Sequence, residues 1–256
     1  MKVVHSAQEL PSGCAFVPTM GALHAGHGSL FTLAAKYSDV VVASIFINPL
    51  QFENQEDLLK YPKTPEADID LAQRFGVTHL WLPKHDEIYP KEFESLKAGA
   101  IGDLFEGASR PGHFDGVVTV VNRLFQLAKP KFAVFGEKDF QQLKLVEAIA
   151  GDIEIIRGPI IRETDGLAMS SRNIRLSPDG RAAASIIYKA LSTAKSESEL
   201  QEILKSEALL ELDYATFIDE ESFLPASNES KQVRAIVAGW INGVRLLDNM
   251  KMEISV

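Results

Sequence analysis

Short apolar runs alternate along this chain with stretches whose apolar residues recur at helical spacing. The most continuous run, residues 40–47, is rich in β-branched side chains, which predicts a strand buried on both faces of a sheet. Because such strands alternate with predicted helices, the pattern predicts an α/β fold, a parallel sheet with helices on both faces. The predicted strands are 14–17, 40–47, 77–82, 132–135 and 153–156 with a continuation through 159–162; the predicted helices are 29–37, 66–74, 116–127 and a segment ending at 150.

The pattern changes after Ser177. Two predicted helices, 181–194 and 197–210, are followed by strands at 214–218 and 232–238 and by the apolar segment 244–249, which predicts a small C-terminal α+β domain. Turn-forming residues at 165–166 and 177–180 mark the junction. We therefore predict two domains, residues 1–175 and 176–256.

Residues 98–116 are rich in glycine and polar side chains. Loops of this length inside a compact domain are usually functional or mobile, so we predict a functional loop. The residues that give the segment this character are Gly99, Gly102, Gly107, Arg110, Pro111, Gly112, His113 and Gly116.

Composition limits the class of protein. The chain has 256 residues, 46% of them hydrophobic and 24% charged, which allows a substantial core. Its net charge of −9 argues against nucleic-acid binding, which depends on clustered Lys and Arg. The single cysteine excludes an internal disulfide, and the longest apolar run is too short to cross a bilayer. We expect a cytoplasmic protein with no nucleic-acid partner and no membrane partner.

The stretch from Pro18 to His27 lies between a predicted strand and a predicted helix. Such a turn directs backbone N–H groups and the positive end of the helix dipole at one point, which suits an anion. His24 and His27 are three residues apart, so both rings can face that point. A capping and packing role is the alternative. Zinc chelation is disfavoured because it needs further ligands and the only cysteine is Cys14.

The pattern of a strand, a glycine and a helix start is repeated at residues 132–142. Lys138 is suited to a phosphate and Gln142 follows it on the same helix face, although a solvated helix cap would explain both. Asn48 and Gln51 follow the strand at 40–47, and ligands gather at the carboxyl ends of parallel strands. An ordinary turn with a surface glutamine is the alternative there.

The segment 165–173 offers many hydrogen-bond donors and little apolar surface. Ser170, Ser171 and Arg172 could clamp phosphate oxygens, with the guanidinium gripping two of them at once. A polar linker between domains is the other interpretation, and the two are compatible.

In this order, the segments resemble the pantoate–β-alanine ligase (pantothenate synthetase) family along the whole chain. The resemblance implies the Rossmann-like sheet shared by His-x-Gly-His nucleotidylyltransferases. It also implies an AMP-forming ligase that condenses (R)-pantoate with β-alanine through a pantoyl adenylate, releases diphosphate and forms a homodimer. The matching segments are 18–27, 46–52, 61–65, 106–107 with 110–117, 135–142, 165–173 and 244–249.

The resemblance also assigns roles to residues of this chain. Its catalytic set is His24, His27, Lys138, Ser170, Ser171 and Arg172, with His27 at the family's acid–base position. Its ATP-binding set is Met20, Gly21, Ala22, Leu23, His24, Ala25, Gly26, His27, Gly136, Glu137, Lys138, Asp139, Ile161, Met169, Ser170, Ser171 and Arg172. Gln51, Gln142 and Asn48 would bind pantoate and β-alanine. Mg²⁺ is expected on the ATP phosphates with Asp68 as a candidate ligand, residues 98–116 as a lid, and the C-terminal domain as a cover for the active site.

The chain departs from the family pattern in a few places. Gly28 replaces a bulky residue after the second histidine, Phe140 stands where tyrosine is common, Asp68 lacks an acidic neighbour at Ala67, and the C-terminal domain is short. These departures bear on the helix start and on the metal site. The rival functions are another His-x-Gly-His nucleotidylyltransferase, which would need more basic residues for a phosphorylated acceptor, and a non-catalytic nucleotide sensor. A class I synthetase is disfavoured by the short, acidic chain.

Overall fold

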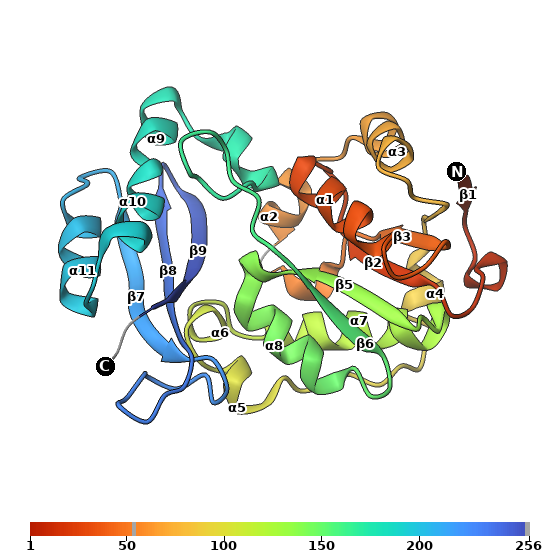
Figure 1. Cartoon of the computed structure of the whole chain (residues 1–256). Helices are drawn as coiled ribbons and strands as arrows, with labels where there is room; N and C mark the ends of the chain where they lie inside the picture. The colour runs from red at the N-terminus through yellow and green to blue at the C-terminus, as the bar shows by residue number, and fades with distance from the viewer. Residues whose placement is uncertain (53–54, 254–256) are drawn as a thin grey trace. The chain divides into compact units, whose positions relative to one another are not determined.

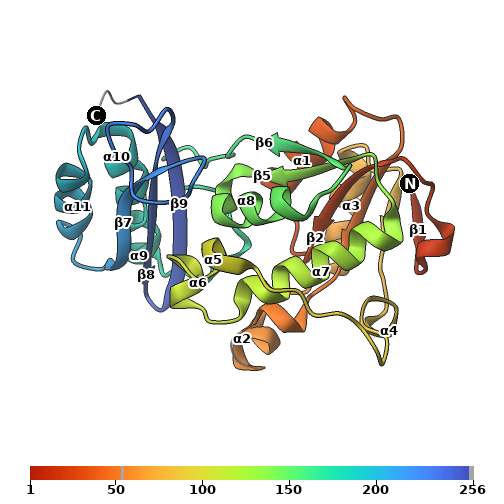
Figure 2. The same cartoon turned by 90° about the horizontal axis from the view of Figure 1, so that it is seen from below.

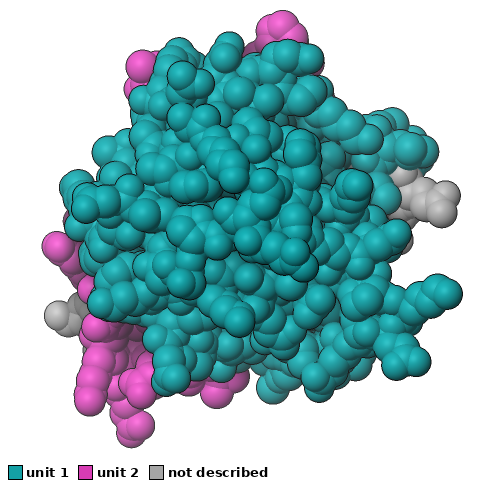
Figure 3. All heavy atoms as spheres, turned by 90° about the vertical axis from the view of Figure 1, so that its right-hand side faces the viewer, with its two compact units in different colours: residues 1–159 teal, residues 160–256 magenta. Residues whose placement is uncertain are grey.

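A computed structural model describes residues 1–52 and 55–253 of the chain (Figure 1). The chain divides into two compact units, Met1–Pro159 and Ile160–Val256, which Figure 3 colours separately. The sequence predicted a division between residues 175 and 176. Residues 160–175, which the sequence assigned to the first domain, belong to the second unit. The reason is Arg162, whose Nη2 donates to Asp248 Oδ1 at 3.0 Å and so ties this segment to the C-terminal sheet.

The first unit is built on a six-stranded sheet in the order β1-β4-β3-β2-β5-β6, with all neighbouring strands parallel. The predicted fold class is confirmed. The edge strand β1 was not predicted, and residues 159–162 do not continue β6. The strands are β1 (Lys2–Val4), β2 (Ala15–Thr19), β3 (Val41–Ile45), β4 (His79–Trp81), β5 (Phe132–Gly136) and β6 (Glu154–Gly158).

Helices cover both faces of this sheet (Figures 1 and 2). Helices α1 (Ala25–Ala34) and α3 (Pro65–Arg74) lie on one face, and α7 (His113–Ala128) and α8 (Phe140–Ile149) lie on the other. The chain leaves β2 toward β3 and returns to β5 on the opposite side, so the topological switch point lies at the carboxyl ends of β2 and β5, where ligands bind in such sheets. Short helices α2 (Gln55–Lys60) and α4 (His85–Ile88) occupy the connections, and no described helix is long and apolar enough to cross a membrane.

The prediction of a loop at residues 98–116 was wrong. The segment forms α5 (Gly99–Gly102), α6 (Glu106–Ser109) and the start of α7. Gln141 of α8 holds the first two: its Nε2 donates to the carbonyl oxygens of Ile101 and Leu104, both at 2.7 Å, and its Oε1 accepts from the Glu106 N–H at 3.1 Å. This attachment to α8 could not be read from the glycine-rich composition.

The second unit contains a three-stranded antiparallel sheet, β7 (Glu211–Asp219), β8 (Val233–Ile241) and β9 (Val244–Met252). Its helices are α9 (Pro178–Ala183), α10 (Ser185–Thr193) and α11 (Glu197–Lys205), and its core joins helical Ile187 and Leu200 to Phe217 and Val237 of the sheet. The α+β prediction is confirmed. The helix predicted over 181–194 is instead two helices and begins earlier, because Ser177 caps it and Pro178 takes its first position. The helix predicted to reach residue 210 ends at Lys205.

Candidate active site

The turn that follows β2 is held by a buried carboxylate from α3. Asp68, which is 3% exposed, accepts the Ala22 N–H at Oδ2 (3.0 Å) and the Leu23 N–H at Oδ1 (2.7 Å). The Thr64 hydroxyl donates to the same Oδ1 at 2.9 Å. Asp68 therefore uses both oxygens to fix the shape of the turn, a role that the sequence prediction of a metal ligand did not include.

The two histidines cap the start of α1, and backbone N–H groups there fix the tautomer of each ring. His24 Nδ1 accepts the Gly26 N–H at 3.1 Å, and His27 Nδ1 accepts the His24 N–H at 3.2 Å. The ring centroids are 4.1 Å apart. In a neutral imidazole whose Nδ1 is an acceptor, Nε2 must carry the proton. Both rings therefore present an Nε2–H donor.

Both rings are neutral at pH 7. Burial lowers the pKa of His24 to about 4, with the Lys138 charge adding to the effect. Burial also lowers the pKa of His27 to about 3, with His24 as the next cause. The folded chain therefore disfavours the imidazolium form of both residues. The pair offers neutral hydrogen-bond donors instead.

These pKa values predict that the chain loses stability as the pH falls from 7 to 5. Below its usual pKa of about 6.5 the unfolded imidazole takes up a proton that the folded one refuses, so the unfolded state gains about 1–2 kcal/mol per histidine over this range. Urea unfolding of the wild type and of a His24→Asn/His27→Asn variant at both pH values measures the effect. We expect a smaller pH difference in the variant, whereas equal pH differences would contradict the assigned burial effect. His79, whose pKa is also lowered by burial, contributes equally to the pH dependence of the wild type and of the variant.

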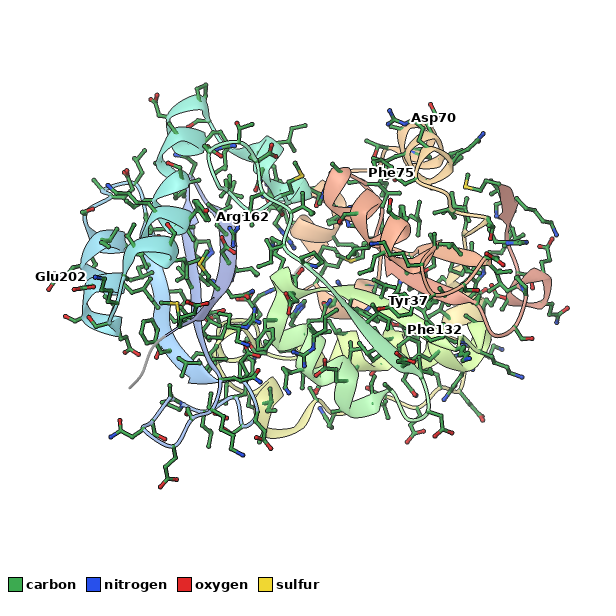
Figure 4. The ribbon with its side chains drawn as sticks, in the orientation of Figure 1. Tyr37, Asp70, Phe75, Phe132, Arg162 and Glu202 are labelled. Atoms are coloured by element: carbon green, nitrogen blue, oxygen red, sulfur yellow. The ribbon has the colours of Figure 1, made fainter. Side chains whose placement is uncertain are left out.

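The ring of Phe75, at the C-terminal end of α3, explains why residue 28 is a glycine (Figure 4). A Cβ at residue 28 would stand 2.7 Å from Phe75 Cε2. The aromatic ring thus fills the space that a side chain after the second histidine would need. In this chain the bulk at the contact between α1 and α3 is therefore supplied by Phe75.

We predict that Gly28→Ala destabilises the fold by about 1–3 kcal/mol, because the added methyl overpacks this contact. A Gly28→Ala/Phe75→Leu variant should recover much of the loss, since leucine vacates the ring position. The free energy of unfolding in urea measures both. Gly136→Ala is the control, because its added Cβ would meet only Leu30 Cδ1 at 3.9 Å. A Gly28→Ala chain as stable as the wild type would contradict the prediction.

The carboxyl end of β5 adds a cation to the site. A 3₁₀ turn, Glu137–Asp139, joins β5 to α8, and Lys138 Nζ lies 3.7 Å from Asp139 Oδ1. The Lys138 charge contributes to lowering the pKa of His24 and of His27. The structure therefore brings this lysine and both histidines together at the switch point. Gln142 is half-buried on α8, one turn beyond Lys138.

Gln51 and Asn48 lie beyond the carboxyl end of β3, in and just before the 3₁₀ turn Pro49–Gln51. Both are buried, with Asn48 1% and Gln51 8% exposed. Gln51 Nε2 lies 2.8 Å from the sulfur of Met20, so this glutamine reaches the turn that leads to the histidines. The sequence alternative of a surface glutamine is excluded.

The remaining predicted residues form a hairpin in the second unit. The Met169 N–H donates to the Ile161 carbonyl oxygen at 2.9 Å, and the Glu163 N–H donates to that of Leu167 at 2.8 Å. Ser170 then caps a 3₁₀ turn, Ser171–Arg175, by accepting the Arg172 N–H at 3.2 Å. Ser170, Ser171 and Arg172 are half-buried.

Arg162 anchors that hairpin. Besides Asp248 it reaches the Gly166 carbonyl oxygen with Nη1 at 3.0 Å, and its guanidinium carbon lies 4.8 Å from the centre of the Tyr188 ring (Figure 4). Each set of predicted residues is thus assembled within its own unit. Among residues 1–52 and 55–253, no three His, Cys, Asp or Glu side chains gather as a protein-only metal site requires.

The fold and the first set of residues define a class: an α/β protein with a strand–turn–helix unit at its topological switch point, an arrangement suited to an anion. Known proteins narrow the class. A family model described as Pantoate-beta-alanine ligase matches residues 1–251. The chain belongs to the pantoate–β-alanine ligase family.

Individual relatives agree with the family model. Pantothenate synthetase from Chlorobium chlorochromatii is 43% identical over 93% of this chain and 89% of the relative. The crystal structure of pantothenate synthetase from Thermus thermophilus is 40% identical, with a TM-score of 0.91 over 98% of this chain and 99% of that one. Pantoate-beta-alanine ligase from Francisella tularensis, crystallised with Beta-gamma ATP and β-alanine, is 35% identical with a TM-score of 0.84, over 98% and 97% of the two chains.

Proposed function

We propose that this chain condenses (R)-pantoate with β-alanine, converting ATP to AMP and diphosphate. The observation that carries the proposal is the family match over residues 1–251, together with the Francisella relative that binds an ATP analogue and β-alanine. A pantoate carboxylate oxygen bonds to the α-phosphorus of ATP as diphosphate leaves. The β-alanine amine then bonds to the acyl carbon of the adenylate as AMP leaves and a proton is released.

In the first step, negative charge builds on the phosphate oxygens. The Nε2–H groups of His24 and His27 and the Lys138 ammonium are donors already fixed at the switch point, and preorganised donors stabilise such charge. His27 acts here as a neutral donor. The backbone of 20–27 and of 136–139 completes the ATP site of the first unit.

The family resemblance assigns further ATP-binding residues to the hairpin of the second unit, and we include them in the proposal. Ile161 would meet adenine through its backbone, Met169 lies across the hairpin from it, and Ser170, Ser171 and Arg172 would bind phosphate. Mg²⁺ enters as part of the substrate, on the ATP phosphates, because Asp68 is committed to the turn after β2.

Gln51 and Gln142 bind the hydroxyls and the carboxylate of pantoate. Gln51 suits this task because, among the described residues, its NH₂ group faces a thioether, a weak acceptor that a substrate oxygen replaces at small cost. The homodimer is what the family resemblance implies and the cytoplasmic location is what the composition predicts; sedimentation of the purified chain tests the dimer.

The test is release of AMP and diphosphate by the purified chain with ATP and Mg²⁺, omitting pantoate and β-alanine in turn. We expect AMP only when both substrates are present, and pantothenate in equal amount. ATP binding without turnover would favour the nucleotide sensor. Turnover with a phosphorylated acceptor instead would favour another nucleotidylyltransferase.

A further inference from the structure

We propose that the Tyr89 hydroxyl is a positioning group for pantoate: through Asn48 it stabilises the orientation in which the Gln51 amide turns its NH₂ group toward the substrate. The inference rests on the proposed binding of pantoate by Gln51. Tyr89 follows α4, far along the chain from the turn that carries Gln51, and it lies outside the short motifs quoted in the sequence analysis. The contacts involved all belong to the first unit.

Two backbone groups favour one orientation of the Asn48 amide, and the Tyr89 hydroxyl adds to them. Asn48 Oδ1 faces the Leu50 N–H at 3.2 Å, which only donates, and its Nδ2 faces the Gly116 carbonyl oxygen at 3.0 Å, which only accepts. The Tyr89 hydroxyl donates to the same Oδ1 at 2.6 Å. The second hydrogen of Nδ2 goes to Gln51 Oε1 at 3.1 Å, so all four positions of the Asn48 amide are used within the protein.

The orientation of Asn48 then determines that of Gln51. Because Nδ2 donates, Gln51 must turn its Oε1 toward Asn48 and its NH₂ group away, toward the Met20 sulfur. The Gln51 backbone is also held: His113 Nδ1 lies 2.7 Å and Arg110 Nη2 3.3 Å from its carbonyl oxygen. A donor is therefore presented where an anionic substrate with hydroxyl groups is to bind.

Tyr89 makes this orientation hard to reverse. Its side chain is buried, and its ring packs on Phe46 and Phe93 with centroids 6.0 and 4.8 Å away. Burial raises the pKa of its phenol, so the hydroxyl keeps the proton that it donates to Asn48 Oδ1. Gly116 contributes as well, since a Cβ there would stand 2.2 Å from the Leu50 carbonyl oxygen and push α7 away from Asn48.

The test is Tyr89→Phe, which removes one oxygen from the tyrosine and keeps the ring. Asn48 Oδ1 loses one of its two donors, so the Asn48 and Gln51 amides turn over more often and the NH₂ group is presented less of the time. We expect KM for pantoate to rise about 3- to 10-fold, the range that one hydrogen bond supplies. KM for ATP should change less than about 2-fold, a split that a general loss of structure would not produce.

Controls separate the possible outcomes. Tyr37→Phe removes a hydroxyl from a 41% exposed tyrosine of the same unit and should leave both KM values unchanged. Equilibrium titration of Tyr89→Phe with pantoate should show the same weakening as KM. An unchanged KM for pantoate, or equal rises for pantoate and ATP, would overturn the inference. A wild-type chain that makes no pantothenate would instead overturn the proposed function.

Discussion

Replacing His27 by asparagine is expected to lower kcat about 100- to 1,000-fold without unfolding the chain, the range observed when one preorganised donor to a developing oxyanion is removed. Asparagine places an oxygen where Nδ1 now accepts the His24 N–H at 3.2 Å, so the helix start is kept. It has no atom at the Nε2 position. The substitution therefore separates the capping role of His27 from its role as a donor to phosphate.

The measurement is pantoate-dependent exchange of labelled diphosphate into ATP, which reports adenylate formation without β-alanine. The variant should lose exchange and overall turnover by similar factors and keep its melting temperature within a few degrees. His79→Asn, on β4, is the control and should leave both rates intact. A wild-type kcat that depends on an ionisation near His27's usual pKa of about 6.5, absent from the variant, would show that His27 titrates and would contradict a neutral donor.

The sequence predicted those features of the site that lie next to each other along the chain. The pattern of a buried strand, a glycine and a helix start predicted the two strand ends, those of β2 and β5, that form the switch point. The spacing of His24 and His27 predicted that both rings lie at the start of one helix. Lys138 was found by the same pattern at β5. Local spacing carried this information because a strand end and the next helix start are neighbours in sequence as well as in space.

Features that depend on distant contacts were missed. Asp68 is 46 residues from Ala22, whose N–H it accepts, and no local pattern links α3 to the turn after β2. The segment 98–116 was taken for a loop because the hydrogen bonds that order it come from Gln141, beyond α7. The neutral state of the histidines depends on burial, which is a property of the folded chain.

The contribution of Asp68 leads to the second large prediction: Asp68→Asn should destabilise the chain by about 2–4 kcal/mol. Asn keeps one acceptor and turns an NH₂ group toward a backbone N–H, so one of the bonds to Ala22 and Leu23 is lost and a buried donor is left unpaired. The turn before His24 loosens as a result, and kcat/KM for ATP should fall together with stability.

The decisive measurement is the free energy of unfolding without nucleotide and with EDTA present, because a metal ligand contributes nothing under those conditions. Asp70→Asn is the matched control: Asp70 lies on the same helix, is exposed, and points away from the sheet (Figure 4), so its removal should change neither stability nor activity. If Asp68→Asn instead unfolds like the wild type and only raises the Mg²⁺ concentration needed for turnover, the carboxylate is a metal ligand as the sequence first indicated. The two backbone hydrogen bonds at 3.0 and 2.7 Å and the Thr64 hydroxyl at 2.9 Å favour the structural role, since together they use three of the roughly four acceptor positions of the carboxylate.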